Sequence, residues 1–331
     1  MSHVDASRGA ALDIGPWRPG DEASIGRLFE RVFGRAQTVA HWRWQFLVPD
    51  GVPRVTVARD ERGEVVAHFG CVPRRAIADG AACMASNGVD SMVAPEYRAG
   101  LKRRGLFARL GELYVESFGW PGPDHFGYGL PSPVAFRVGC RLLAYVPLRD
   151  VALLVRPVAP SPRCVPGLDV QVGPQAPRDL DELWARVAAR QPLTVVRDRR
   201  YMVWRYERCP GGAYQFVLAR RAGAPAALAV FAPRAPSDDG ATVADLLWAG
   251  DDDEALQACL DETATLAQRE GRQHLALLAA PDAPEARQLQ AAGWRPVPLG
   301  LPLIARCFAP ALQPELLRSR WSYALGDFDL I

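Results

Sequence analysis

Two stretches of this sequence resemble each other, and this repetition constrains the fold more than any other feature. Residues 201–232 can be aligned on residues 41–73, and Trp204 then falls on Trp44. In both stretches a turn containing proline and glycine follows, then a strand that ends in Ala-Arg, another turn and a second apolar strand. Two tandem copies of one fold explain this pattern more simply than coincidence.

Length and composition set the outer limits of the prediction. A chain of 331 residues with 49% hydrophobic content can bury a large core and favours two domains. The net charge of +2 argues against a general nucleic-acid-binding protein. The seven cysteines lack metal-ligand spacing and indicate reduced thiols, and no apolar run reaches the roughly 18 residues of a membrane span. We therefore expect a soluble cytoplasmic protein with no metal, nucleic acid or membrane partner.

One stretch carries the clearest chemical signal. Val89–Val93 is a short apolar strand that ends before Pro95, and the basic residues Lys102, Arg103 and Arg104 precede Gly105 and an amphipathic helix. A glycine at a helix start lets the backbone approach a ligand, and the free N–H groups there favour an anion. The stretch predicts a phosphate site, with a solvated basic surface as the alternative reading.

The same stretch resembles motif A of the GNAT acyltransferase superfamily, whose loop Q/R-x-x-G-x-G/A wraps the pyrophosphate of acyl-coenzyme A. The match runs from Lys102 to Phe107, with lysine in the first position and phenylalanine in place of the last small residue. Ala99–Leu101 are additional to the usual motif. The order of predicted elements over residues 12–156 is also similar to that of the family.

The resemblance implies an α/β (α+β) fold of two tandem GNAT-like lobes, each a mixed, mostly antiparallel sheet flanked by helices. We predict an acyl-CoA-binding catalytic domain over residues 1–157 and a degenerate GNAT-like domain over residues 158–331. A proline-rich stretch from Arg156 to Pro166 reads as the linker. An unrelated second α/β domain is the alternative.

The second copy differs where the first has its basic loop. Its strand Val243–Trp248 leads to Gly250 and then to four consecutive carboxylates, Asp251–Glu254. Carboxylates stabilise a helix N-terminus but repel a pyrophosphate at short range. We therefore expect only the first copy to bind coenzyme A.

In the family, pantetheine lies between the strand before the phosphate loop and the strand after the helix. The resemblance implies that in this sequence the gap lies between Ser91–Val93 and Phe126–Leu130. A backbone N–H near Met92 or Val93 is then expected to face the thioester oxygen. The implied co-substrate is acetyl-CoA or another acyl-CoA. The residues predicted to bind it are Ser91, Met92, Val93, Lys102, Arg103, Arg104, Gly105, Leu106, Phe107 and Ser132.

Candidates for proton transfer are less clear. GNAT enzymes often place a tyrosine acid where this sequence has Ala135, and Tyr128 is a substitute, although an aromatic residue in a central strand is usually core. Asp90 lies in an apolar strand and is either a general base, an amine anchor or a structural hydrogen-bonding group. His68 is a candidate base, with a core histidine as the alternative.

Two further segments are candidates for the acceptor side. His41 and Trp42 belong to an aromatic helix that borders the acceptor pocket in the GNAT fold, although such residues are commonly core. The chain ends in WSYALGDFDLI, a composition that suggests docking toward the first lobe. In some multi-lobed relatives the terminal carboxylate is the base. We therefore predict substrate contacts by Asp327 and Asp329, and catalysis by the Ile331 carboxylate.

Together these features predict an N-acyltransferase that moves an acetyl or other short acyl group from acyl-CoA to an amine of a small-molecule acceptor. A non-catalytic acyl-CoA-binding or scaffold protein, or an acyltransferase with an acyl-carrier-protein donor, is the alternative. The sequence leaves open the acceptor, the acyl length and the oligomeric state.

Overall fold

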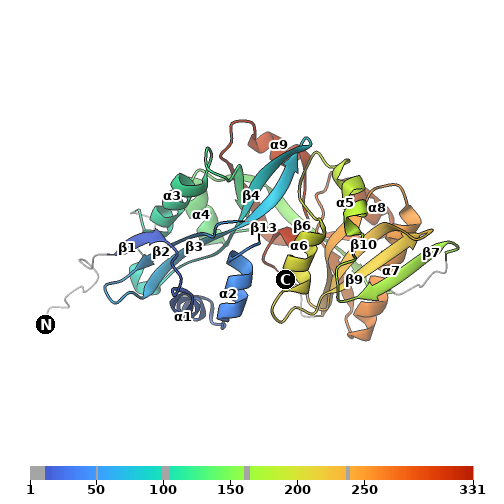
Figure 1. The fold of residues 1–331 in the computed structure, drawn as a ribbon, viewed down its shortest axis with the longest axis horizontal. Helices are drawn as coiled ribbons and strands as arrows, with labels where there is room; N and C mark the ends of the chain where they lie inside the picture. The colour runs from blue at the N-terminus through green and yellow to red at the C-terminus, as the bar shows by residue number, and fades with distance from the viewer. Residues whose placement is uncertain (1–11, 50, 99–103, 160–164, 236–238, 331) are drawn as a thin grey trace. The chain divides into compact units, whose positions relative to one another are not determined.

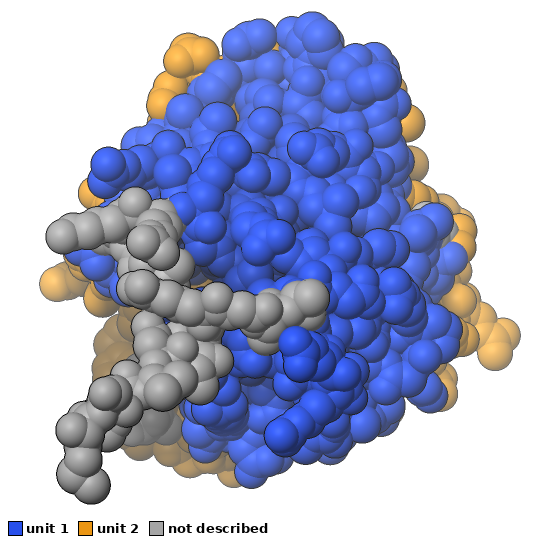
Figure 2. All heavy atoms as spheres, turned by 90° about the vertical axis from the view of Figure 1, so that its left-hand side faces the viewer, with its two compact units in different colours: residues 1–74, 84–147, 303–314 blue, residues 75–83, 148–302, 315–331 orange. Residues whose placement is uncertain are grey.

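The computed structural model describes residues 12–49, 51–98, 104–159, 165–235 and 239–330. Contacts within the chain define two compact units, coloured separately in Figure 2. Unit 1 consists of residues 1–74, 84–147 and 303–314, and unit 2 of residues 75–83, 148–302 and 315–331. No helix in the described part of the chain combines the length and apolar character that a membrane crossing requires.

Unit 1 has a sheet in the order β1-β2-β3-β4-β5-β13. Two helices precede β2, and two others flank β5 (Figure 1). Its elements are β1 (Asp13–Pro16), α1 (Glu22–Phe33), α2 (Val39–Phe46), β2 (Arg54–Arg59), β3 (Val65–Ala78), β4 (Ala81–Val93), the 3-10 turn η1 (Pro95–Tyr97), α3 (Leu106–Phe118), β5 (Phe126–Gly129) and α4 (Pro133–Leu142).

Unit 2 has a sheet in the order β6-β12-β11-β10-β9-β7. Its strands are β6 (Val146–Pro157), β7 (Leu168–Gly173), β8 (Leu193–Val195), β9 (Gln215–Arg221), β10 (Ala224–Ala232), β11 (Gly240–Trp248), β12 (His274–Leu277) and β14 (Trp321–Ser322). The strand β13 (Arg295–Cys307) begins in unit 2, and its residues 303–307 belong to unit 1. Its helices are α5 (Leu180–Ala188), α6 (Arg199–Met202) with a π-helical turn over Val203–Glu207, α7 (Asp253–Arg269), α8 (Pro284–Ala291), α9 (Pro314–Arg320) and η3 (Leu325–Asp327).

The two units repeat one pattern, as the sequence predicts. In unit 1, β2 and β3 are antiparallel, and β4 and β5 are parallel strands joined by α3. In unit 2, β9 and β10 are antiparallel, and β11 and β12 are parallel strands joined by α7. The short helices α4 and α8 follow at equivalent places. The predicted fold class, mixed α/β with two GNAT-like lobes, is confirmed.

Each sheet ends in a strand from the other half of the sequence. Residues 154–157 of β6 pair with β12 in unit 2, and residues 304–307 of β13 pair with β5 in unit 1. The units are therefore not the uninterrupted segments 1–157 and 158–331. Pairing between strands so far apart in sequence leaves no local signal, and for this reason the sequence alone did not indicate the exchange.

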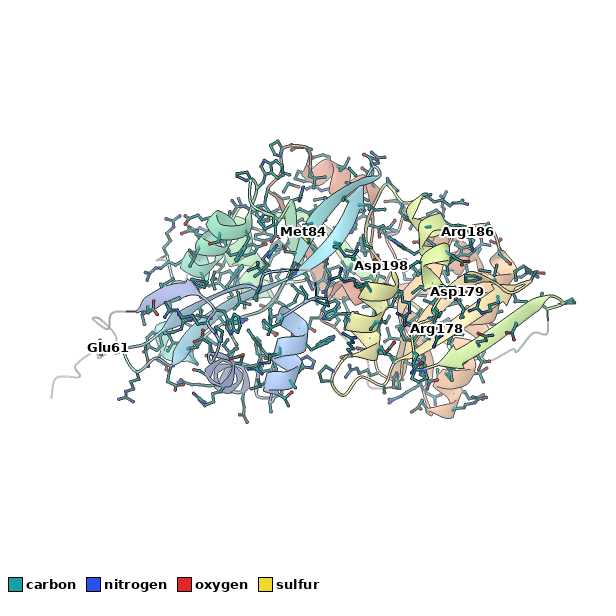
Figure 3. The ribbon with its side chains drawn as sticks, in the orientation of Figure 1. Glu61, Met84, Arg178, Asp179, Arg186 and Asp198 are labelled. Atoms are coloured by element: carbon teal, nitrogen blue, oxygen red, sulfur yellow. The ribbon has the colours of Figure 1, made fainter. Side chains whose placement is uncertain are left out.

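The described part of the C-terminal tail packs within unit 2. Arg197 joins two buried carboxylates, with 2.7 Å from Nε to Asp245 Oδ1 and 2.6 Å from Nη2 to Asp327 Oδ2. Arg205 donates to the carbonyl oxygens of Gly326 and Phe328, each at 3.2 Å. Neighbouring α6 is capped by Asp198 (Figure 3), which accepts from Tyr201 N–H at 2.9 Å. Side-chain charges and backbone carbonyls together hold the tail in place.

The packing of the tail leaves no room for a side chain at Gly326. A Cβ atom there would collide with the Tyr206 hydroxyl and the Asp245 carboxylate. We expect Gly326→Ala to lower the free energy of unfolding by about 1–3 kcal/mol, the usual cost of overpacking. Urea unfolding monitored by tryptophan fluorescence measures this, with Gly173→Ala as the control because a Cβ at Gly173 meets nothing within 4 Å. Equal stability of both variants would contradict the prediction.

Candidate functional site

Unit 1 contains a pocket of about 390 Å³ beside the end of β4. The pocket is lined by residues 91–93 of β4, Tyr97 and Arg98, residues 105–108 at the start of α3, and Ser132 with residues of α4. Val32 and Phe33 of α1 complete the wall. Most of these side chains are apolar, and Arg98 is the single charged side chain among the described lining residues.

The pocket forms where β4 continues beyond the end of its neighbouring strand β5. Ala85–Asn87 pair with Phe126–Tyr128, but β5 ends at Gly129 while β4 continues to Val93. On its other side β4 stays attached to β3, since Ala94 N–H donates to Val66 O at 2.9 Å. The backbone of Ser91–Val93 therefore borders an opening instead of a neighbouring strand, at the place where the sequence predicted a pantetheine site.

The start of α3 faces this pocket, and its N-terminus is uncapped in the sense that the N-cap residue provides no side chain. That residue is Gly105, which has no side-chain atom to accept a hydrogen bond from the first turn. The first N–H groups of a helix have no partner within the helix, and its dipole makes this end positive. Gly105, Leu106 and Phe107 all line the pocket. The arrangement suits an anion, and the phosphate site stays a prediction.

Two basic residues are described near this helix start. Arg98 donates from Nε to Val93 O at 2.9 Å and lines the pocket. Arg104 forms an ion pair with Glu112 on α3, and its side chain is 69% exposed. The other predicted cations, Lys102 and Arg103, lie outside the described residues. Arg98 was not among the predicted ligands, although its place between the strand and the basic loop was a signal for it.

The equivalent helix of unit 2 has a different N-terminus. Asp252 caps α7 by accepting from Ala255 N–H at 2.9 Å. Arg221 pairs with Asp252 at 2.8 Å and with Glu254 at 2.7 Å, and its hydrogen bond lowers the pKa of Asp252 despite partial burial. Protein carboxylates thus occupy the position that a phosphate would need. This contrast supports the expectation that unit 1 alone holds the cofactor.

Asp90 and His68 lie together beside the pocket wall. Asp90 has a left-handed backbone (φ 50°), is half-buried, and accepts from Gln37 Nε2 at 3.2 Å. His68 is 1% exposed, and its Nδ1 lies 2.9 Å from Asp90 O. The rings of Phe46 and Trp42 pack edge-on against the imidazole at 5.3 and 6.4 Å. Asp90 precedes the pocket-lining Ser91, so of this pair it is the better placed for chemistry.

The remaining unit 1 candidates divide between pocket and core. Ser132 lines the pocket and caps α4, accepting from Ala135 N–H at 3.4 Å. Tyr128 and Trp42 are each 1% exposed and pack in the core. His41 is half-buried, and its ring lies 5.1 Å from that of Trp44 in a tilted arrangement. The burial of Tyr128 and Trp42 favours the structural alternative that the sequence left open, while their functional roles stay predictions.

The tail candidates belong to unit 2. Asp327 has no exposed surface and is paired with Arg197, which favours a structural role. Asp329 is exposed, and Ile331 lies outside the described residues. Among the described residues, histidine, cysteine and acidic side chains do not gather in a group of three that could hold a metal ion.

Burial should make His68 a source of pH-dependent stability. Desolvation lowers its pKa from 6.5 to about 4, so between these values only the unfolded chain binds a proton there. Stability is then lost as pH falls from 6.5 to 4. The difference of about 2.5 pKa units corresponds to about 3 kcal/mol.

Urea unfolding of the wild type and His68→Asn at pH 7 and pH 4 tests this expectation. The variant lacks the titrating group, so the wild type should lose about 3 kcal/mol more than the variant on acidification. Equal losses in the two proteins would show that His68 titrates normally.

Comparisons with known proteins agree on the fold. No family model and no curated protein matches the sequence. A conserved protein of Enterococcus faecalis V583, described as a probable N-acyltransferase, is 12% identical over 94% of this chain and 75% of its own, with a TM-score of 0.67. A tandem GNAT protein from the clavulanic acid biosynthesis pathway is 14% identical, with 91% and 100% covered and a TM-score of 0.57.

Saccharomyces cerevisiae N-myristoyltransferase with bound myristoyl-CoA is 10% identical, with 90% of this chain and 82% of its own covered and a TM-score of 0.58. At such low identities the likeness establishes the fold and leaves the activity to be argued from the site. The repeated sequence pattern, the order of the strands and the similarity to solved structures all indicate the same fold. The chain has the fold of the GNAT N-acetyltransferases.

Proposed function

We propose that this protein is an acyl-CoA-dependent N-acyltransferase whose site lies in unit 1. One observation carries the proposal: the open side of β4 and the uncapped N-terminus of α3 meet at a single, mainly apolar pocket. Backbone groups at a strand edge suit the amides of pantetheine, and a helix N-terminus suits a pyrophosphate. The pocket thus offers both kinds of contact that an acyl-CoA needs.

The charged end of the ligand would bind at the helix. Phosphate oxygens would accept from the N–H groups of the first turn of α3, with Arg98 beside them. Lys102 and Arg103 are proposed to add to this binding. The acyl chain would extend along Met92, Leu106 and the apolar wall of α4.

Acyl transfer then needs an amine close to the thioester. The amine nitrogen attacks the carbonyl carbon, the C–S bond breaks, and the amine loses a proton. We assign the proton acceptor to Asp90, which is half-buried and adjacent to the pocket-lining Ser91. Ala135 offers no acid to the leaving sulfur, but a thiol with a pKa near 8.5 leaves readily as thiolate. Missing acid catalysis therefore does not exclude turnover.

The structural neighbours support acyl-CoA as donor without fixing the acyl length. One is described as a probable N-acyltransferase and another was solved with myristoyl-CoA. We propose an acetyl or other short acyl group and a small-molecule amine acceptor, since a pocket of about 390 Å³ must also hold the pantetheine arm.

Binding and turnover should be measured separately. Thermal shift with acetyl-, butyryl- and octanoyl-CoA reports binding, and release of free thiol with a panel of small amines reports transfer. We expect stabilisation by at least one acyl-CoA and amine-dependent thiol release. Binding without release would favour a non-catalytic acyl-CoA protein, and no binding at all would refute the proposed donor.

Arg98 provides a test of cofactor binding. Arg98→Gln removes the charge next to the predicted pyrophosphate while keeping a donor. The loss of one charge-assisted contact, worth about 1.5–3 kcal/mol, should raise the KM for acyl-CoA about 10- to 100-fold with little change in kcat. Arg62→Gln, at an exposed turn, is the matched control. An unchanged KM in Arg98→Gln would place the phosphates elsewhere.

Asp90 provides a test of proton removal. Asp90→Asn removes the charge but keeps a residue that tolerates a left-handed backbone and can accept from Gln37. We expect kcat to fall about 100-fold or more, with KM for acyl-CoA nearly unchanged, because general bases contribute factors of this size. Asp150→Asn, an exposed aspartate, is the control. Wild-type kcat in Asp90→Asn would rule out Asp90 as the base.

A further inference from the structure

His68 presents a buried polar group that proton transfer does not use. It does not line the pocket, its Nε2 has no hydrogen-bond partner among the described residues, and aromatic rings enclose it. Among the described residues, the hydrogen-bond partner of its Nδ1 is the carbonyl oxygen of Asp90. A carbonyl oxygen only accepts, so the imidazole proton must sit on Nδ1. The histidine is therefore a donor fixed toward the backbone of β4.

The ring is held firmly in this position. Phe46 packs edge-on against it at 5.3 Å, and Gly70 approaches so closely that a Cβ atom there would lie 2.6 Å from His68 Cε1. Such packing leaves the imidazole little freedom to turn away. The direction of its Nδ1–H is thus set by the core of unit 1.

Asp90 is the point where β4 departs from regular geometry. Its φ of 50° is unusual for a residue other than glycine and costs of order 1–2 kcal/mol unless the surroundings hold it. His68 holds the carbonyl oxygen of this residue and Gln37 holds its carboxylate. Two separate contacts therefore maintain the left-handed turn.

The turn decides where the next N–H group points. In a planar trans peptide the C=O and N–H groups point in opposite directions. The Asp90 C=O points toward His68 on β3, so the Ser91 N–H of the same peptide plane points to the other side of β4. On that side β5 has ended, and Ser91 lines the pocket.

We propose that His68 is a positioning residue: by holding the Asp90 carbonyl, it directs the Ser91 N–H into the pocket as the donor to the thioester oxygen. This inference rests on the proposed acyl-CoA function. It assigns the donor to Ser91, one residue before Met92, and it replaces the idea that His68 is a base. When the amine attacks, negative charge develops on the thioester oxygen, and a preorganised N–H stabilises it.

The test compares two substitutions in the full-length protein. His68→Asn keeps an amide N–H near the place of Nδ1–H, whereas His68→Leu has a similar volume and no donor. The thioester band of acetyl-CoA labelled with ¹³C at the carbonyl is recorded by infrared difference spectroscopy, and affinity and kcat are measured alongside. Donation to the carbonyl lowers this frequency, and a purely structural role for His68 would leave the band unchanged.

We expect the wild type and His68→Asn to lower the band to a similar extent. His68→Leu should bind acetyl-CoA with nearly unchanged affinity but lose most of the band shift. Its kcat should fall ~10- to 100-fold, because removal of an oxyanion donor itself costs about 100-fold or more and His68 acts on that donor indirectly. An equal band shift in the wild type and His68→Leu would overturn the inference and leave the proposed function standing. Loss of activity in His68→Asn with an unchanged band would overturn it in favour of a base.

A measurement on the wild type alone covers the case in which His68→Leu fails to fold. The ¹⁵N spectrum of the imidazole should show the proton on Nδ1. The Ser91 amide, assigned by its loss from the spectrum of serine-labelled Ser91→Ala, should move downfield on addition of acetyl-CoA. A proton on Nε2, or an unmoved Ser91 amide in protein that binds acetyl-CoA, would overturn the inference. No binding of any acyl-CoA would instead refute the proposed function on which it rests.

Discussion

The site in unit 1 depends on the separation of two parallel strands. β4 and β5 share only three paired positions before β5 ends, and β4 then runs on to Val93 with β3 as its neighbour. An unpaired strand edge carries N–H and C=O groups that must find other partners. In this unit those groups border a pocket, and the left-handed turn at Asp90 lies where the opening begins. The proposed ligand contacts and the proposed oxyanion donor both follow from this geometry.

The two units share one strand–helix–strand arrangement, but the N-terminus of the helix suits an anion only in unit 1. Both place a helix between parallel strands, so both have a helix N-terminus at the same point of the repeat. In unit 1 the N-cap residue is Gly105, which has no side chain to cap the helix. In unit 2 the carboxylate of Asp252 caps it and Arg221 neutralises the carboxylate. A cap made by the protein stabilises α7 and removes the free N–H groups on which phosphate binding depends. Unit 2 is thus better suited to a structural role.

Several predicted site residues make contacts that stabilise the fold, and this favours the structural alternative for them. Trp42 and Tyr128 contribute to the core of unit 1, and Asp327 joins Arg197 and Asp245 in a buried network that holds the C-terminal tail within unit 2. A charged or aromatic residue in an apolar stretch shows in sequence that it needs a partner, but not which partner it has. Conversely, Arg98 and Phe33 line the pocket although neither was predicted to do so, and of the two only Arg98 lies beside the predicted basic loop in sequence. Their contribution depends on the tertiary structure, which brings the end of α1 and the residue after η1 to the same pocket.

The sequence by itself determined the repeat, the fold class, and the strand, glycine and helix that form one wall of the pocket. These features are local: periodicity, turn residues and a helix start are written in neighbouring positions. The tertiary structure alone decided the exchange of β6 and β13, the pairing of His68 with the Asp90 carbonyl, and the burial that separates core aromatics from pocket residues. Those outcomes depend on contacts between residues far apart in the chain, for which a single sequence carries no direct signal.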